Sequence, residues 1–120
     1  MFAQGHFAQA LPYLQNADRK DRINDLIART LLIKIFYETG AEETLFAQLD
    51  NLEQFLKREK LSNYHRENFS NFLRFARMIV ALPPHQPAKA NDLKQAILCC
   101  DTLSEKEWLV KRLDAKVRKR

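Results

Sequence analysis

A chain of 120 residues has room for one domain with a hydrophobic core and little room for two. Its content of 46% apolar and 29% charged residues, with a net charge of +5, excludes a disordered chain, which combines low hydrophobicity with high charge. No run of about 18 apolar residues is present, which excludes a membrane-spanning helix, and residues 1–20 show no secretory signal pattern.

The scarcity of turn-forming residues is the first indication of the fold class. The chain has 2 glycines and 4 prolines, whereas a sheet protein of this length needs many tight turns built on glycine, proline and asparagine. Runs that alternate apolar and polar residues and are rich in β-branched side chains are also missing. The sequence therefore predicts an all-α fold, with about six helices.

The first two helices are predicted over residues 7–17 and 23–39. The apolar face of the first consists of Phe7, Ala10, Leu14 and Ala17. Asp21 is the expected N-cap of the second, and Gly40 follows it where a C-terminal cap favours a left-handed residue. The second helix is apolar around most of its circumference, which indicates burial on more than one side. The residues concerned are Ile27, Leu31, Leu32, Ile33, Ile35, Phe36 and Tyr37.

The third and fourth helices are predicted over residues 42–59 and 62–82, each with one apolar face. Pro83 and Pro84 end the fourth helix, because proline cannot continue a helix. The apolar stripe of the third helix is Leu45, Leu49, Leu52 and Leu56, widened by Phe46 and Phe55. The face of the fourth is formed by Phe69, Phe72, Leu73, Ala76, Ile79 and Val80.

The last two helices are predicted over residues 88–100 and from Ser104 onward. Ser104 and Glu107 have the spacing of a capping box. Trp108 follows it directly, and we expect its side chain to be buried and to seal the last helix onto the fold. The inward residues of the fifth helix are Leu93, Ala96, Ile97 and Cys100, and those of the sixth are Trp108, Leu109, Leu113 and Val117.

Gly5 and Gly40 are separated by 35 residues, close to the tetratricopeptide period of about 34. The run Gly5-His6-Phe7-Ala8-Gln9-Ala10, with Leu14 and Ala17, resembles the turn and second helix of such a repeat. Leu32, Phe36, Tyr37 and Gly40 resemble the first helix of the next repeat. The match covers residues 5–56, and the whole chain is similar to the C-terminal region of uncharacterised bacterial tetratricopeptide-like proteins. The resemblance implies one helical-repeat domain over residues 1–120, folded as an α-α superhelix of antiparallel hairpins and forming the C-terminal portion of a longer protein. It implies no reaction.

Residues that could carry chemistry do not form a known site. His6, His65 and His85 lie far apart, and no Cys-x-x-Cys or His-Glu-x-x-His motif occurs. Cys99 and Cys100 are adjacent, and vicinal cysteines bridge each other only through a strained ring. We therefore expect a reducing, cytoplasmic setting, with Cys100 filling core space. We expect no catalytic site, metal or cofactor.

The resemblance also places five residues of the second helix on the concave, partner-binding side. They are Ile27, Thr30, Lys34, Tyr37 and Glu38. The alternative is that a neighbouring helix covers them. A second surface, formed by Phe2, Phe7 and Leu11, is expected to lack a cover and to mediate self-association, most simply as a homodimer.

The basic charge is confined to the second half of the chain. Residues 61–120 carry 12 Lys and Arg against 6 Asp and Glu, whereas residues 1–60 carry 8 against 9. In residues 64–77 aromatic side chains alternate with Arg and Asn, as in some single-strand binders, but an inward aromatic stripe with a solvated basic flank explains the same pattern. The sequence therefore favours a non-catalytic protein-interaction or assembly module. The alternatives are a helical nucleic-acid-binding protein that uses the basic half, and a structural C-terminal cap of a longer repeat protein.

Overall fold

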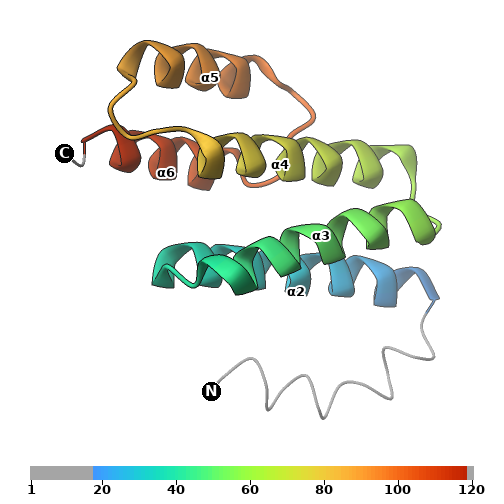
Figure 1. Ribbon diagram of the computed structural model, residues 1–120. Coiled ribbons are helices and arrows are strands. Elements are labelled where there is room, and N and C mark those ends of the chain that lie inside the picture. Colours follow the sequence, from blue (N-terminus) through green and yellow to red (C-terminus); the bar gives the residue numbers. More distant parts are fainter. Residues whose placement is uncertain (1–17, 119–120) are drawn as a thin grey trace. The chain divides into compact units, whose positions relative to one another are not determined.

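The protein is all-helical over the residues that its structure describes (Figure 1). This computed structural model describes residues 18–118, and the side chains of residues 22–117. Its helices are α2 (Asp18–Thr39), α3 (Glu42–Arg58), α4 (Asn63–Ala81), α5 (Pro87–Cys99) and α6 (Lys106–Arg118), with no strand in the described range. The all-α prediction is confirmed. The helix predicted over residues 7–17, and with it Phe2, Phe7 and Leu11, lies outside the described residues.

The helices fall into two compact units, an N-terminal unit over residues 1–61 and a C-terminal unit over residues 62–120. In the N-terminal unit α2 packs against α3. The two helices reverse direction at Gly40, whose φ of 73° is the left-handed conformation that glycine adopts without a steric penalty. The amide of Ala41 closes the turn by donating to the carbonyl of Phe36 at 3.0 Å. The predicted C-terminal cap at Gly40 is thus confirmed.

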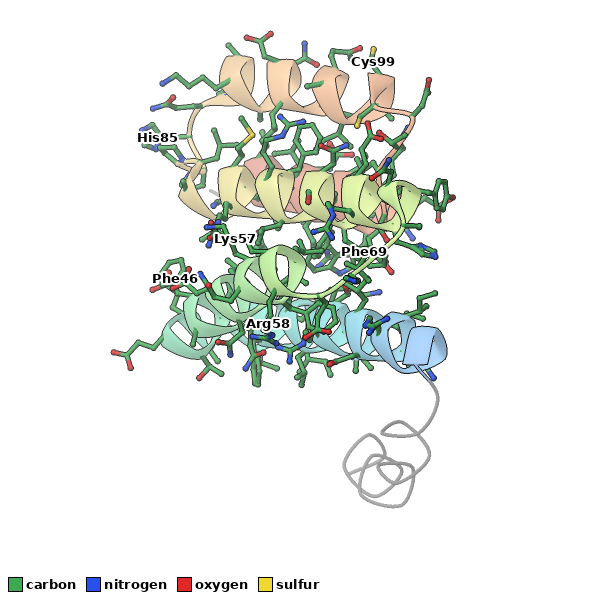
Figure 2. The ribbon with its side chains drawn as sticks, turned by 90° about the vertical axis from the view of Figure 1, so that its right-hand side faces the viewer. Phe46, Lys57, Arg58, Phe69, His85 and Cys99 are labelled. Carbon is green, nitrogen blue, oxygen red and sulfur yellow. The ribbon has the colours of Figure 1, made fainter. Side chains whose placement is uncertain are left out.

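The buried residues of the N-terminal unit follow the predicted stripe of α3. They are Leu26, Thr30 and Ile33 on α2 and Leu45, Leu49, Leu52, Phe55 and Leu56 on α3. The prediction for Phe46 is wrong: its side chain is 48% exposed and extends from the outer side of α3 (Figure 2), because it lies about 100° around the helix from Leu45. Asp21 is also not an N-cap, since α2 already begins at Asp18.

In the C-terminal unit, α6 packs against both α4 and α5. The N-terminus of α4 is capped by Ser62, whose hydroxyl accepts from the His65 amide at 3.2 Å. The most deeply buried side chains are Phe72, Phe75 and Ile79 on α4, Ile97 on α5, and Leu109 and Leu113 on α6. On α5, Ala90 is buried and Ala96 is exposed, so the buried side of this helix is displaced from the predicted one.

The start of α6 differs from the prediction. The helix begins at Lys106, so Ser104 is not its N-cap. Instead, the Ser104 amide donates to the carbonyl of Asn68 on α4 at 3.2 Å. Glu105 then has a φ of 61°, a left-handed conformation that is uncommon outside glycine. The long-range bond to α4, which no local motif encodes, therefore decides where the last helix starts.

Hydrogen bonds between two side chains of α4 and Thr102, which lies in the connection between α5 and α6, strengthen this attachment. The Asn71 amide nitrogen donates to the carbonyl of Thr102 at 2.8 Å and to its hydroxyl at 3.2 Å. The Thr102 hydroxyl in turn donates to Glu67 Oε2 at 3.3 Å. The connection between the last two helices is therefore held on α4 by polar contacts as well as by apolar packing.

Trp108 was expected to be buried, because it follows the predicted capping box, but it is less buried than this. Its side chain is half-buried, with the indole ring 6.3 Å from the ring of Phe72 and tilted against it. Because α6 starts at Lys106, the interior positions go to Leu109 and Leu113, which are four residues apart and almost fully buried. Trp108 lies beside this stripe and covers the edge of the core.

Candidate interaction surface

The five residues predicted to contact a partner all lie on α2, but they do not all reach its surface. Ile27 is 55% exposed and Glu38 is exposed, whereas Lys34 and Tyr37 are half-buried. Thr30 is 3% exposed, because it lies on the same side of α2 as Leu26 and belongs to the interior of the N-terminal unit. Thr30 is therefore part of the core and not of the contact surface.

An apolar row runs along the outer side of α2, which we call the α2 ridge. It consists of Ile23, Ile27, Leu31 and Ile35, at successive i, i+4 positions. Ile27 is the most exposed of the four, and the other three are half-buried. The sequence indicated this feature only indirectly, through the apolar circumference of the second helix. The structure separates that circumference into a buried side and the ridge.

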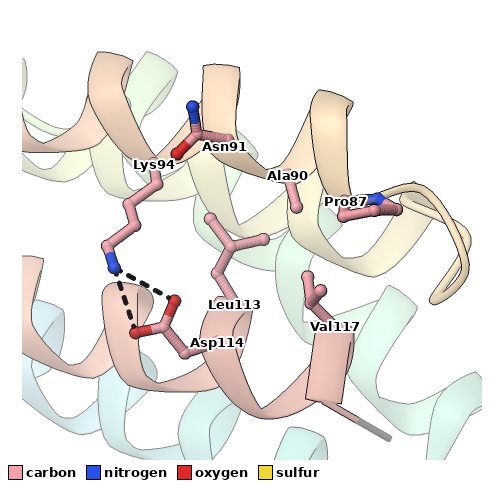
Figure 3. A pocket seen from close by; sticks show the side chains of 7 residues that line it. All are labelled: Pro87, Ala90, Asn91, Lys94, Leu113, Asp114 and Val117. Atoms are coloured by element: carbon pink, nitrogen blue, oxygen red, sulfur yellow. Dashed lines mark hydrogen bonds and ion pairs between the residues drawn. The ribbon is translucent and has the colours of Figure 1, made fainter. Parts of the chain in front are cut away.

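A groove between α5 and α6 is the other notable surface feature (Figure 3). It has a volume of about 290 Å³ and is lined by Pro87, Ala90, Asn91 and Lys94 of α5 and by Leu113, Asp114 and Val117 of α6. Ala90 and Leu113 are buried, so they form its apolar floor. We call it the α5–α6 groove. No sequence pattern predicted it, because it depends on how far apart the two helices lie.

One ion pair crosses the α5–α6 groove. Lys94 Nζ lies 3.3 Å from Asp114 Oδ1 and 3.4 Å from Oδ2, and both side chains are about one-third exposed (Figure 3). Such a pair adds little stability at a surface position. It does neutralise the carboxylate at the groove, so the lining presents no unpaired negative charge to an apolar ligand.

The basic residues of the C-terminal unit make many contacts inside that unit. Lys116 Nζ donates to the carbonyls of Ile79 and Val80 in the last turn of α4, where the helix dipole favours a positive charge. Lys106 Nζ donates to the Leu98 carbonyl at 3.2 Å. These ammonium groups hold helices together and are directed at the protein's own backbone.

In residues 64–77 most aromatic side chains point inward, as the second interpretation of this stretch predicts. Phe72 and Phe75 are buried and Phe69 is half-buried, so these three rings do not form an exposed platform for bases, whereas Tyr64 at the start of α4 is 67% exposed. Arg74 is exposed, with its guanidinium 4.3 Å from the centre of the Phe75 ring. An arginine over an aromatic face is a common packing arrangement.

Residues with metal-binding or redox chemistry do not converge in the part of the chain that the structure describes. Over those residues no group of three His, Cys, Asp or Glu side chains could hold a metal ion. Cys99 is an exposed free thiol (Figure 2), and Cys100 is half-buried and also free, so Cys100 fills core space only in part. His6 lies outside the described residues. None of the described helices is long and apolar enough to cross a membrane.

Glu59 is a carboxyl whose titration the structure perturbs. Its pKa is lowered mainly by the hydrogen bond from Arg58, whose Nε lies 3.0 Å from Glu59 Oε2; Arg22 lowers it further. Arg22 Nε is 3.4 Å from Glu59 Oε1. Since Arg22 is on α2 and Glu59 follows α3, this cluster joins the two helices of the N-terminal unit. Its role is structural.

Comparisons with known proteins were made at three levels. No protein-family model, no curated protein and no solved structure matches the chain.

Proposed function

We propose that this chain is a non-catalytic protein-interaction or assembly module that binds a partner through the α2 ridge. The observation that carries the proposal is the exposure of Ile27, which is 55% exposed in an apolar row that lies about 100° around α2 from its buried side. Burying an isoleucine of this kind contributes about 1–2 kcal/mol to binding. Single exposed apolar residues are ordinary, whereas a row of them along one helix favours an interface.

The proposal includes the helical-repeat architecture. The antiparallel pair of α2 and α3, closed by a left-handed Gly40, supports a tetratricopeptide-like hairpin within an α-α superhelix. In such a fold each hairpin presents one helix to a partner, which is the position that we assign to α2. A reducing, cytoplasmic setting is part of the proposal, and the free, adjacent Cys99 and Cys100 support it.

A protein partner accounts for these observations better than nucleic acid does. Several cations of the basic half contact backbone carbonyls or a carboxylate of their own unit, as Lys116, Lys106 and Lys94 do. Single-strand binding also needs several exposed aromatic faces for stacking. Phe72 and Phe75 in the basic stretch are buried, and of its aromatic rings it is Tyr64 that is mostly exposed, at 67%. The exposed apolar ridge belongs to the N-terminal unit, which has no basic excess.

A differential capture experiment tests the proposal. The native chain, an Ile27→Lys variant and an Ala47→Lys control are immobilised, and the proteins that they retain from cells of the source organism are quantified. Ala47 is exposed on α3 and outside the ridge, so the control adds the same charge to the same unit. We expect partners to be retained by the native chain and the control and depleted at least tenfold on Ile27→Lys. Equal retention by all three folded proteins would refute binding through the ridge and would favour the purely structural role.

A further inference from the structure

Each unit carries one apolar surface feature. The α2 ridge is a row of apolar side chains on the N-terminal unit, and the α5–α6 groove is a hollow with an apolar floor on the C-terminal unit. We propose that the partner of the α2 ridge is a second copy of this chain, which receives the ridge in its α5–α6 groove, so that copies associate head to tail. This inference rests on the proposed function of the ridge and names its occupant.

The two surfaces have comparable lengths once the exposed Leu98 is included. From Ile23 to Ile35 the ridge is about 18 Å long at about 1.5 Å per residue. The lining of the groove on α5 runs from Pro87 to Lys94, about 10 Å, and reaches about 16 Å at Leu98. Rows of residues four apart form the ridges that pack into grooves between side chains on neighbouring helices. Leu98, 46% exposed near the end of α5, would extend the apolar contact beyond the lining of the groove.

The floor of the groove suits a branched aliphatic side chain. Ala90 is the smallest residue of the lining, and it lies opposite Leu113 and Val117 of α6 (Figure 3). The hollow of about 290 Å³ holds more than one isoleucine side chain. The carboxylate of Asp114 is paired with Lys94, so an apolar side chain that enters the groove leaves no charge without a partner.

The charges of the two units favour pairing between unlike ends. Residues 1–61 carry a formal charge of −1 and residues 62–120 a charge of +6. Contact between two C-terminal units is opposed by like charge, whereas contact between an N-terminal and a C-terminal unit is weakly attractive.

Head-to-tail contact has a consequence that distinguishes it from a two-fold dimer. Each copy uses a different surface on each neighbour, so the chain of contacts continues until it closes into a ring or grows into an open array. A variant with a broken ridge still has an intact groove, and a variant with a broken groove still has an intact ridge. Mixing the two variants should therefore restore one contact, and only one.

The experiment is light scattering after size exclusion, over a dilution series of the purified full chain. The ridge is broken by Ile27→Lys and the groove by Asn91→Arg, an exposed position on its rim. Ala47→Lys and Ala96→Arg are the matched controls, since both alanines are exposed and lie outside the two surfaces. Circular dichroism verifies that all four variants are folded.

We expect the mass of the native chain and of both controls to rise with concentration above the monomer mass of 14.1 kDa. Each broken variant alone should stay at the monomer mass, and their equimolar mixture should reach a dimer of about 28 kDa without further growth. A native chain that stays monomeric would overturn the head-to-tail inference, while the capture experiment would still decide whether the ridge binds another protein. If Asn91→Arg associates like the native chain and Ile27→Lys stays monomeric, the copies pair ridge to ridge. This result would also overturn the head-to-tail inference.

Discussion

Thr30 provides the sharpest test of the packing between α2 and α3. Its side chain is 3% exposed, and its hydroxyl oxygen has no hydrogen-bond partner among the described residues. Burying an unpaired hydroxyl costs about 1–3 kcal/mol, and a methyl group in its place contributes about 0.8 kcal/mol of apolar burial. Threonine and valine have similar helix propensities. Thr30→Val should therefore raise the free energy of unfolding by about 1–3 kcal/mol.

The measurement is urea unfolding followed by circular dichroism, and thermal melting should show an increase of roughly 4 °C per kcal/mol for a chain of this size. Thr39→Val is the control in the same helix. The Thr39 side chain is exposed and its hydroxyl donates to the Ile35 carbonyl at 3.0 Å, so its replacement should change stability by less than about 0.5 kcal/mol. Unchanged or lower stability in Thr30→Val would mean that the hydroxyl has a partner in solution, and the reasoning from the orphaned oxygen would be refuted.

Three further predictions concern other contacts. Asn71→Ala removes two hydrogen bonds to Thr102 and should lower stability by about 1–2 kcal/mol in urea unfolding; a loss no larger than that of Asn91→Ala, an exposed control, would contradict this role. Glu105→Gly should raise the midpoint of thermal unfolding, because glycine adopts the left-handed conformation at this position without the steric cost of about 1 kcal/mol. A lower midpoint would show that the glutamate side chain stabilises the fold by more than this cost. The pKa of Glu59 is lowered below 4.5 in the folded chain, so its contribution is present at neutral pH and is lost as pH falls through the folded pKa. The stability difference between the native chain and Glu59→Gln should accordingly shrink from pH 6 to pH 3 in denaturant titrations, and a constant difference would contradict the assigned cause.

Local signals in the sequence were sufficient to predict most helix boundaries. Gly40 was identified as a cap because it acts on backbone groups within a few residues of itself. Pro83 and Pro84 ended the fourth helix for the same reason. The start of α6 could not be predicted in this way, because the amide of Ser104 is bound by a carbonyl 36 residues earlier in the chain. The capping-box spacing of Ser104 and Glu107 describes only a local arrangement, which the bond from the Ser104 amide to Asn68 replaces.

The candidate surface was predicted in part, and the limit was the rotation of α2. One residue along a helix turns the side chain by about 100°, so Ile27 is exposed while Leu26 is buried. Thr30 and Ile27 could not be told apart by pattern, since apolar residues surround the helix. Only the position of α3 determines which side becomes the core. The α5–α6 groove could not be predicted for a similar reason. It depends on the relative position of two helices, and the irregular connection between them does not reveal that position in the sequence.

The positive charge of the second half illustrates why composition alone does not assign a partner. A lysine that donates to neutral carbonyls, as Lys116 and Lys106 do, keeps its full charge and still contributes to the long-range field of the unit. Some of its ammonium hydrogens are nevertheless used within the protein, since Lys116 donates to two carbonyls and Lys106 to one. At a distance this charge attracts a less basic partner and opposes a second basic unit. The proposed contact between the α2 ridge and the α5–α6 groove agrees with this preference, because it joins the basic unit of one copy to the nearly neutral unit of the next.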